Sequence, residues 1–205
     1  MLDIARTLNA NLGEEVEYGI QLIFFDAEEA FLQWSAQDSV YGSRHLAEKW
    51  SVKDKENMSK NEKIALFVLL DLLGNNNIKV YDYFSNTSPL HSEMLSIETK
   101  LRSAHLFELF PRTGFFCSVK FLIFSFYRID STVASIFSSM KRYNSGVEDD
   151  HIPFLRKGVP ILYVMPSPFP SVWHSNRDTV ANVYRPSVSA MASIIRVFVA
   201  QVLHL

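Results

Sequence analysis

Three short apolar runs alternate with helical patterns along this chain, and this alternation limits the folds that it can adopt. The runs are YGIQLIFFDA (residues 18–27), KIALFVLLDLLG (residues 63–74) and VPILYVM (residues 159–165). Each is a continuous stretch of branched and aromatic residues bounded by polar or turn residues, a pattern typical of a buried strand. We therefore predict a strand in each run.

The segments between and around these runs have helical spacing. Residues 88–107 place Leu90, Met94, Ile97 and Leu101 at steps of three and four, as one face of an amphipathic helix requires. We expect Gly13 to end the first helix and Asp38 to cap the second. The predicted helices span residues 2–11, 39–50, 88–107, 151–158 and 186–205. Strands alternating with helices predict an α/β fold with a mostly parallel central sheet flanked by helices.

In such a sheet, ligands bind outside the carboxyl ends of the strands. Glu28 and Glu29 directly follow the first predicted strand, Asp71 lies at the end of the second, and Trp173 and His174 follow the third. The topology therefore predicts that these side chains share one edge of the sheet.

The end of the first run carries an unusual amount of negative charge, because Asp26, Glu28 and Glu29 fall within four positions. Unpaired carboxylates in a low-dielectric site are costly, so a positive group is expected beside them. A zinc ion held by Glu29 and His174 would fit, and Glu28 would then be free to move protons. In the alternative interpretation, the two glutamates begin a solvated helix and His174 is an ordinary loop histidine.

Composition excludes several classes of protein. A formal net charge of −2 over 205 residues gives no basic footprint for nucleic acid. The single cysteine, Cys117, excludes an internal disulfide. Residues 115–127 form the most apolar segment, which is shorter than the roughly 20 residues of a membrane-spanning helix. The first residues, MLDIARTLNANLG, do not suit a signal peptide, so the chain as written is expected in the cytosol.

Three blocks of sequence resemble one known family. They are FFDAEEAFLQWSAQDSVYGSRHLA, LFVLLDLLG and EDDHIPFLRKGVPILYVMPSPFPSVWH. Together they are similar to the glutaminyl-peptide cyclotransferases, the animal glutaminyl cyclases, which are related in fold to zinc exopeptidases with an α/β/α architecture. The similarity covers residues 1 to about 110 and 146–205, so we expect a single domain, residues 1–205.

The resemblance implies a reaction in which the N-terminal glutamine of a peptide or protein substrate cyclises to pyroglutamate and releases ammonia. It implies that Glu29 and His174 bind zinc and that Glu28 carries the proton from the attacking amine to the leaving ammonia. It also implies that Asp71 and Asp149 hydrogen-bond around the substrate and Glu28. Three aromatic residues match positions that wall the substrate pocket: Trp34, Phe169 and Trp173.

Each of these residues also has an interpretation without function. Asp71 could end a strand and cap a turn, and Trp34 and Phe169 could be core aromatics. Asp149 and Asp150 could be a solvated N-cap pair for the helix at residues 151–158. The remaining histidines are expected to be structural: His45, His91, His105, His151 and His204.

The chain also departs from the family pattern. Family members have a third zinc ligand, an aspartate, on a segment before the helix with which this chain starts, so we expect a domain incomplete at the N-terminus and weak or no zinc retention. Residues 112–145 do not resemble the family and are interpreted as an atypical insert. Tyr163 occupies a position that is usually histidine in the family, where the ring joins the hydrogen-bond network around the acidic residues. Ala27 replaces a glycine and would be strained by about 1 kcal/mol if its φ is positive.

Three functions remain open at this point. The first is glutaminyl cyclisation. The second is a zinc aminopeptidase, for which we find ligands for only one metal ion. The third is a catalytically inactive fragment or interaction protein of the same fold. Two cellular locations also remain open. The family works along the secretory pathway, whereas this chain shows no signal for it.

Overall fold

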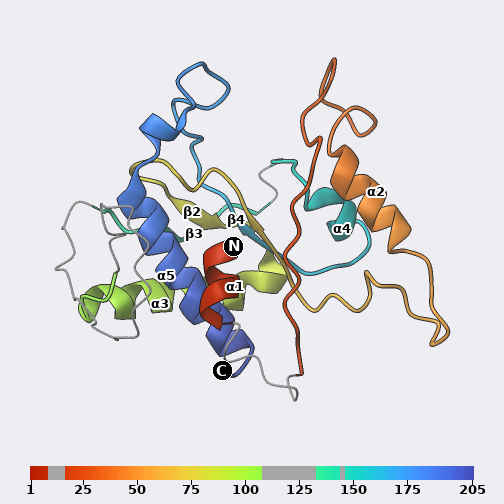
Figure 1. Ribbon diagram of the computed structural model, residues 1–205, viewed down its shortest axis with the longest axis horizontal. Helices are drawn as coiled ribbons and strands as arrows, with labels where there is room; N and C mark the ends of the chain where they lie inside the picture. The colour runs from red at the N-terminus through yellow and green to blue at the C-terminus, as the bar shows by residue number, and fades with distance from the viewer. Residues whose placement is uncertain (9–16, 108–132, 144–145) are drawn as a thin grey trace.

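The computed structural model describes residues 1–8, 17–107, 133–143 and 146–205 (Figure 1). Gly13 and most of the predicted insert lie outside these residues. In the described part, the helices are α1 (Leu2–Leu8), α2 (Tyr41–Lys49), α3 (Ser88–Ser103), α4 (Ile152–Leu155) and α5 (Arg185–Val202), with 3-10 turns η2 (Ser85–Thr87) and η3 (Val180–Asn182). The strands are β1 (Phe67–Leu70), β2 (Val80–Asp82), β3 (Phe137–Lys141) and β4 (Ile161–Val164).

The strands pair in parallel, as the alternation predicted. β1 runs beside β4 from Phe67 opposite Ile161 to Leu70 opposite Val164. β2 runs parallel to β3, and an isolated bridge joins the start of β2 to the chain just after β4. The predicted strands in residues 63–74 and 159–165 are therefore confirmed, and the α/β fold is confirmed with them.

Helices cover both faces of β4, because its side chains alternate between two buried clusters. Leu162 and Val164 join the cluster packed by α1, α3 and α5, whereas Ile161 and Tyr163 join the cluster packed by α2 and α4. Figure 1 shows these two groups of helices on opposite sides of the strands. Among the described helices, none combines the length and the apolar character needed to cross a bilayer.

Two predictions about the N-terminal third are wrong. Residues 18–27 contain no strand: Phe25 packs on Phe67 and Phe154, but the backbone has no ladder partner among the described residues. A strand-like composition indicates only that the side chains suit a half-buried surface. It does not ensure that a neighbouring strand is present to pair with the backbone. Asp38 does not cap α2 either, because Val40 occupies the N-cap position and no side chain bonds there.

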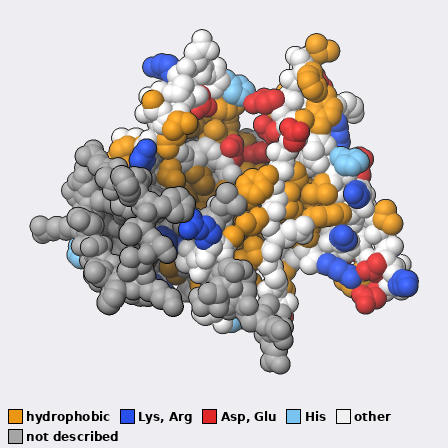
Figure 2. All heavy atoms as spheres, viewed as in Figure 1, with side chains coloured by type: hydrophobic (Ala, Val, Ile, Leu, Met, Phe, Trp, Pro, Cys, Tyr) orange, Lys and Arg blue, Asp and Glu red, His pale blue; other side chains and the backbone are white. Residues whose placement is uncertain are grey.

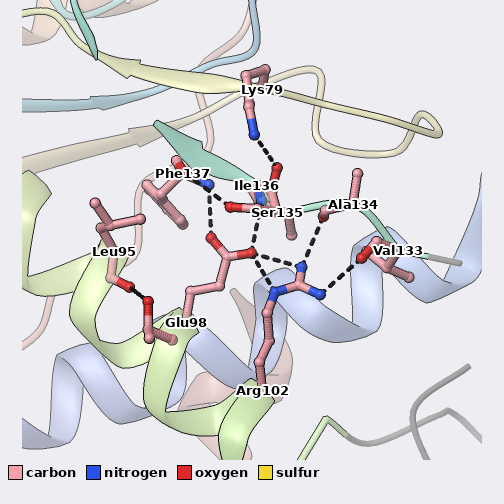
Figure 3. A network of polar contacts seen from close by, with 10 residues as sticks. Lys79, Leu95, Glu98, Arg102, Val133, Ala134, Ser135, Ile136 and Phe137 are labelled. Atoms are coloured by element: carbon pink, nitrogen blue, oxygen red, sulfur yellow. Dashed lines mark hydrogen bonds and ion pairs between the residues drawn. The ribbon is translucent and has the colours of Figure 1, made fainter. Parts of the chain in front are cut away.

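β2 and β3 were not predicted, and β3 lies within the segment interpreted as an insert. Residues 137–141 are mostly polar, yet Phe137 at their start is buried. A buried carboxylate on α3 fixes this strand: both oxygens of Glu98 accept backbone N–H groups, from Ile136 at 2.7 Å and from Phe137 at 2.8 Å (Figure 3). Arg102 pairs with Glu98 at 2.7 Å. At least this part of the segment therefore belongs to the core.

Candidate active site

The glutamates that follow the first apolar run lie on a loop that is closed at its base. Backbone N–H groups of Val40, Tyr41 and Gly42 donate to the carbonyls of residues 28, 27 and 26, at 2.7, 2.9 and 3.1 Å. We call this three-bond closure the stem. A Cβ on Gly42 would overlap the carbonyl oxygen of Asp26, so only glycine allows this close approach.

The stem stores backbone strain on both of its sides. Ala27 has φ 54° and Val40 has φ 44°. Such angles are uncommon without glycine and are costly for a β-branched residue such as valine. Ala27 therefore has the positive φ on which its predicted strain depended.

Asp38 fixes the middle of the same loop. Its carboxylate accepts the backbone N–H groups of Phe31, Leu32 and Gln33, each within 2.9 Å, and the hydroxyl of Tyr41 at 2.7 Å. These hydrogen bonds hold the pKa of Asp38 well below its usual range, the hydroxyl contributing most. The side chain that was expected to cap a helix instead shapes the loop that presents Glu28 and Glu29.

Glu29 and His174 meet although they are 145 positions apart. Glu29 Oε1 and His174 Nε2 lie 2.8 Å from each other, and both side chains are more than half exposed. The imidazole stacks on Trp173 at 3.8 Å between centroids, and Trp173 in turn contacts Phe169 edge to face at 4.6 Å. The predicted convergence of Glu29, Trp173 and His174 is thus present, with the predicted aromatics beside it.

Glu28 lies among four other carboxylates. Glu28 is half-buried, and desolvation followed by the charges of Asp149, Glu29, Asp150 and Asp71 raises its pKa to about 7. Figure 2 shows acidic side chains gathered around a hollow between two projecting parts of the surface. None of these leading contributions comes from a basic side chain of the described residues, so the charges nearest Glu28 disfavour its ionised form.

The aspartates of this group come from two elements. Asp71 directly follows β1, and its N–H still donates to the carbonyl of Val164 at 3.3 Å. Asp149 and Asp150 precede α4 and are 6% and 9% exposed, so the interpretation of a solvated N-cap pair is wrong. Burial, then the charges of Asp71 and Asp150, raises the pKa of Asp149 to about 6, although the N–H of Asp150 donates to it.

Tyr163 enters this acidic group from β4. Its hydroxyl donates to Asp149 Oδ2 at 3.2 Å and contacts the sulfur of Met165. Its ring packs at 4.4 Å against His151, whose pKa burial lowers to about 4. Tyr163 therefore keeps a hydrogen-bond donor next to Asp149, and the neighbouring buried imidazole is neutral at physiological pH.

Trp34 lines a cavity of about 150 Å³ between α2 and α4. Its indole Nε1 donates to Glu148 Oε2 at 2.8 Å. Trp34 and Asp149 both line this cavity, so the cavity borders the acidic group. Sequence reasoning missed Glu148; its only signal was its place next to Asp149.

The donor set at Glu29 and His174 suits a zinc ion. Carboxylate oxygen and imidazole nitrogen are both common zinc ligands, and the two atoms converge on one point. Among the residues that the structure describes, no third histidine, cysteine, aspartate or glutamate completes a cluster with them. The described chain thus offers two of the three protein ligands that catalytic zinc sites generally use.

Comparison with known proteins assigns the class. The model of Peptidase family M28 matches residues 1–199, and the chain belongs to this family. Within it, the chain is similar to the glutaminyl-peptide cyclotransferase of Drosophila melanogaster, with 37% identity over 205 residues that cover 99% of this chain and 53% of the relative. A glutaminyl-peptide cyclotransferase-like protein of Bos taurus is 38% identical over 210 residues and is covered to 49%.

The resemblance predicted from the three sequence blocks is therefore confirmed, and the chain spans about half the length of the curated relatives it matches. Among solved structures, the glutaminyl cyclase of Macrostomum lignano superposes with a TM-score of 0.74 at 32% identity, covering 89% of this chain and 53% of that one. A leucine aminopeptidase precursor from Bacteroides thetaiotaomicron gives 0.60 at 18% identity, covering 94% and 56%, which shows a shared fold alone.

Proposed function

We propose that this chain carries the reacting groups of a glutaminyl-peptide cyclotransferase, which converts the N-terminal glutamine of peptides to pyroglutamate and releases ammonia. The similarity to relatives with that name supports the reaction class. The observation that carries the proposal is the position of Glu28, beside the Glu29–His174 pair and among three aspartates.

Glu28 is suited to move a proton. In the reaction, the α-amino nitrogen attacks the γ-carboxamide carbon, a carbon–nitrogen bond forms, and the bond to the amide nitrogen breaks. The proton that the amine loses must reach the leaving nitrogen. In the metal-free protein the pKa of Glu28 is about 7, and a carboxylate with a pKa near the working pH can accept and return a proton, which is the condition for efficient general acid–base catalysis.

Burial contributes most to that pKa, and the aspartates around Glu28 raise it further. Asp149 stands first among the charges that raise it, and Tyr163 holds Asp149 by donating its hydroxyl. We propose that Asp71 and Asp149 also accept hydrogen bonds from the substrate amine and amide. The pocket would be walled by Trp34, Phe169 and Trp173, which would hold the amine against its own side chain.

Glu29 and His174 would hold a zinc ion, with a third ligand from outside the described residues. When bound, the ion would supply Lewis acidity that polarises the side-chain amide carbonyl. The direct hydrogen bond between the two ligand side chains keeps them together without a metal.

The test measures zinc content and turnover on the same sample of this chain, with a glutamine-leading peptide as substrate. Equimolar zinc with pyroglutamate and ammonia formed in equal amounts would support the proposal. Glu28→Gln should abolish turnover and keep zinc, while Glu48→Gln, at an exposed position on α2, should change neither. Zinc-loaded protein without pyroglutamate would refute it.

A catalytically inactive interaction protein of the same fold is the second candidate, and the two-ligand donor set favours it. It predicts a cooperative thermal melt with neither zinc nor turnover. A zinc aminopeptidase shares the fold, and shortening of the peptide without cyclisation would identify it.

A further inference from the structure

The hydrogen bond between Trp34 and Glu148 joins two parts of the chain that are 114 positions apart. Trp34 lies on the loop that carries Glu28 and Glu29, and Glu148 directly precedes Asp149. The bond is 2.8 Å long and links the indole N–H to a carboxylate, which makes it charge-assisted and stronger than a neutral bond.

The backbone on either side of Trp34 is already fixed. Before it, Asp38 accepts the N–H groups of residues 31–33. After it, the hydroxyl of Ser39 donates to the carbonyl of Ser35 at 2.6 Å, and the N–H of Asp38 donates to the Ser35 hydroxyl at 3.0 Å. The freedom that remains is rotation of the indole about its own side-chain bonds.

Rotation of the indole would change the shape of the cavity that it lines. Trp34 is 37% exposed and lines the cavity between α2 and α4 together with Asp149. An indole N–H can only donate, so it takes the orientation in which an acceptor is available. Glu148 supplies that acceptor at the point where the cavity meets the acidic group.

We propose that Glu148 is a positioning residue that sets the orientation of Trp34 and, through it, the shape of the pocket for the substrate's N-terminal glutamine. The pocket itself rests on the proposed function. Glu148 would not touch the substrate; it acts by holding the indole across the boundary between the pocket and the neighbouring cavity. The expected consequence is an effect on substrate binding with little effect on the chemical step.

The first experiment reads the indole without substrate. The 1H–15N indole signal of Trp34 is assigned from its loss in Trp34→Phe, and its shift is compared in Glu148→Ala and Glu148→Gln. The alanine variant should move the signal and speed its exchange with solvent, whereas glutamine, which retains an acceptor oxygen, should restore most of the wild-type position. Glu48→Ala, on the rim of the same cavity, is the matched control and should leave the signal unmoved.

The second experiment uses the full chain and a glutamine-leading peptide. Glu148→Ala should raise KM about two- to tenfold, as expected for loss of one charge-assisted hydrogen bond at an exposed site, and change kcat less than about twofold. On a Trp34→Phe background, which has no indole donor, the same substitution should add nothing.

An unmoved indole signal in Glu148→Ala, or an equal effect of this substitution with and without the indole, would overturn the proposal. Because the signal is read in the absence of peptide, failure of the proposed function and failure of this inference give different results.

Discussion

A single buried carboxylate, Glu98, and the group of carboxylates around Glu28 have opposite surroundings in this molecule. Glu98 is 1% exposed and is fully compensated by the two backbone N–H groups that start β3 and by the guanidinium of Arg102 (Figure 3). Glu28 lies among like charges, and each of the leading contributions from the described residues raises its pKa. The first arrangement stabilises a strand, whereas the second keeps acids protonatable near neutral pH at the expense of stability.

The largest stability effect is expected at Glu98. Glu98→Ala leaves two buried N–H groups without an acceptor and the guanidinium without its carboxylate, so the free energy of unfolding should fall by about 3–5 kcal/mol in urea titrations. Glu93→Ala, on the same helix and with no ion pair among the described residues, should stay within about 0.5 kcal/mol of wild type. Equal losses of unfolding free energy in both variants would show that the hydrogen bonds and ion pair of Glu98 add no stability.

Removal of the charge of Asp149 should raise the free energy of unfolding, whereas the loss of Glu98 lowers it. Its folded pKa of about 6 exceeds its ordinary value of 3.8, so wild type loses stability as the pH rises from about 4 to about 6. An asparagine side chain cannot ionise, so Asp149→Asn should gain about 1–3 kcal/mol relative to wild type between pH 4 and pH 7, in metal-free protein. The opposite pH dependence of His151 is common to both proteins and cancels; a difference that does not change with pH would contradict this assignment.

At Glu28, stability and activity should separate. Glu28→Gln removes a half-buried carboxylate from among like charges, and after allowance for solvent screening it should raise the free energy of unfolding at pH 8 by about 1 kcal/mol. Under the proposed function, the same substitution should lower kcat by about 10²–10⁴-fold. Urea unfolding and ammonia release on one preparation measure both quantities. A loss of stability in Glu28→Gln would mean that Glu28 stabilises the fold as Glu98 does.

The smallest expected effect concerns backbone strain without any change of charge. Ala27→Gly should raise the free energy of unfolding by up to about 1 kcal/mol, because φ 54° costs glycine nothing. Ala36→Gly, in the same loop but without a positive φ, should give no gain. Thermal melts of the two variants make the comparison.

The sequence predicted the parts of this fold that depend on local pattern. The apolar runs at residues 63–74 and 159–165 and the amphipathic spacing of residues 88–107 are local signals, and all three elements are present. The convergence of Glu29 and His174 was predicted from strand topology. No strand precedes Glu29 in the structure, and the loop closed by the stem presents it to His174 instead.

The errors arose where a partner distant in the sequence decides the structure. β3 reads FSSMK, a polar string that is a strand because Glu98 and β2 supply its hydrogen bonds. Residues 18–27 carry the composition of a strand and lack a ladder partner among the described residues. Asp38 had the pattern of a helix cap, but three nearby N–H groups bind it instead.

The most direct test of the contrast between the two carboxylate groups is a 13C NMR titration of the Asp149 carboxyl in metal-free protein. Weak compensation by the surrounding groups predicts a midpoint near pH 6, well above the ordinary aspartate value of 3.8. A midpoint at or below 4 would mean that Asp149 is as well compensated as a structural carboxylate, and would contradict the account.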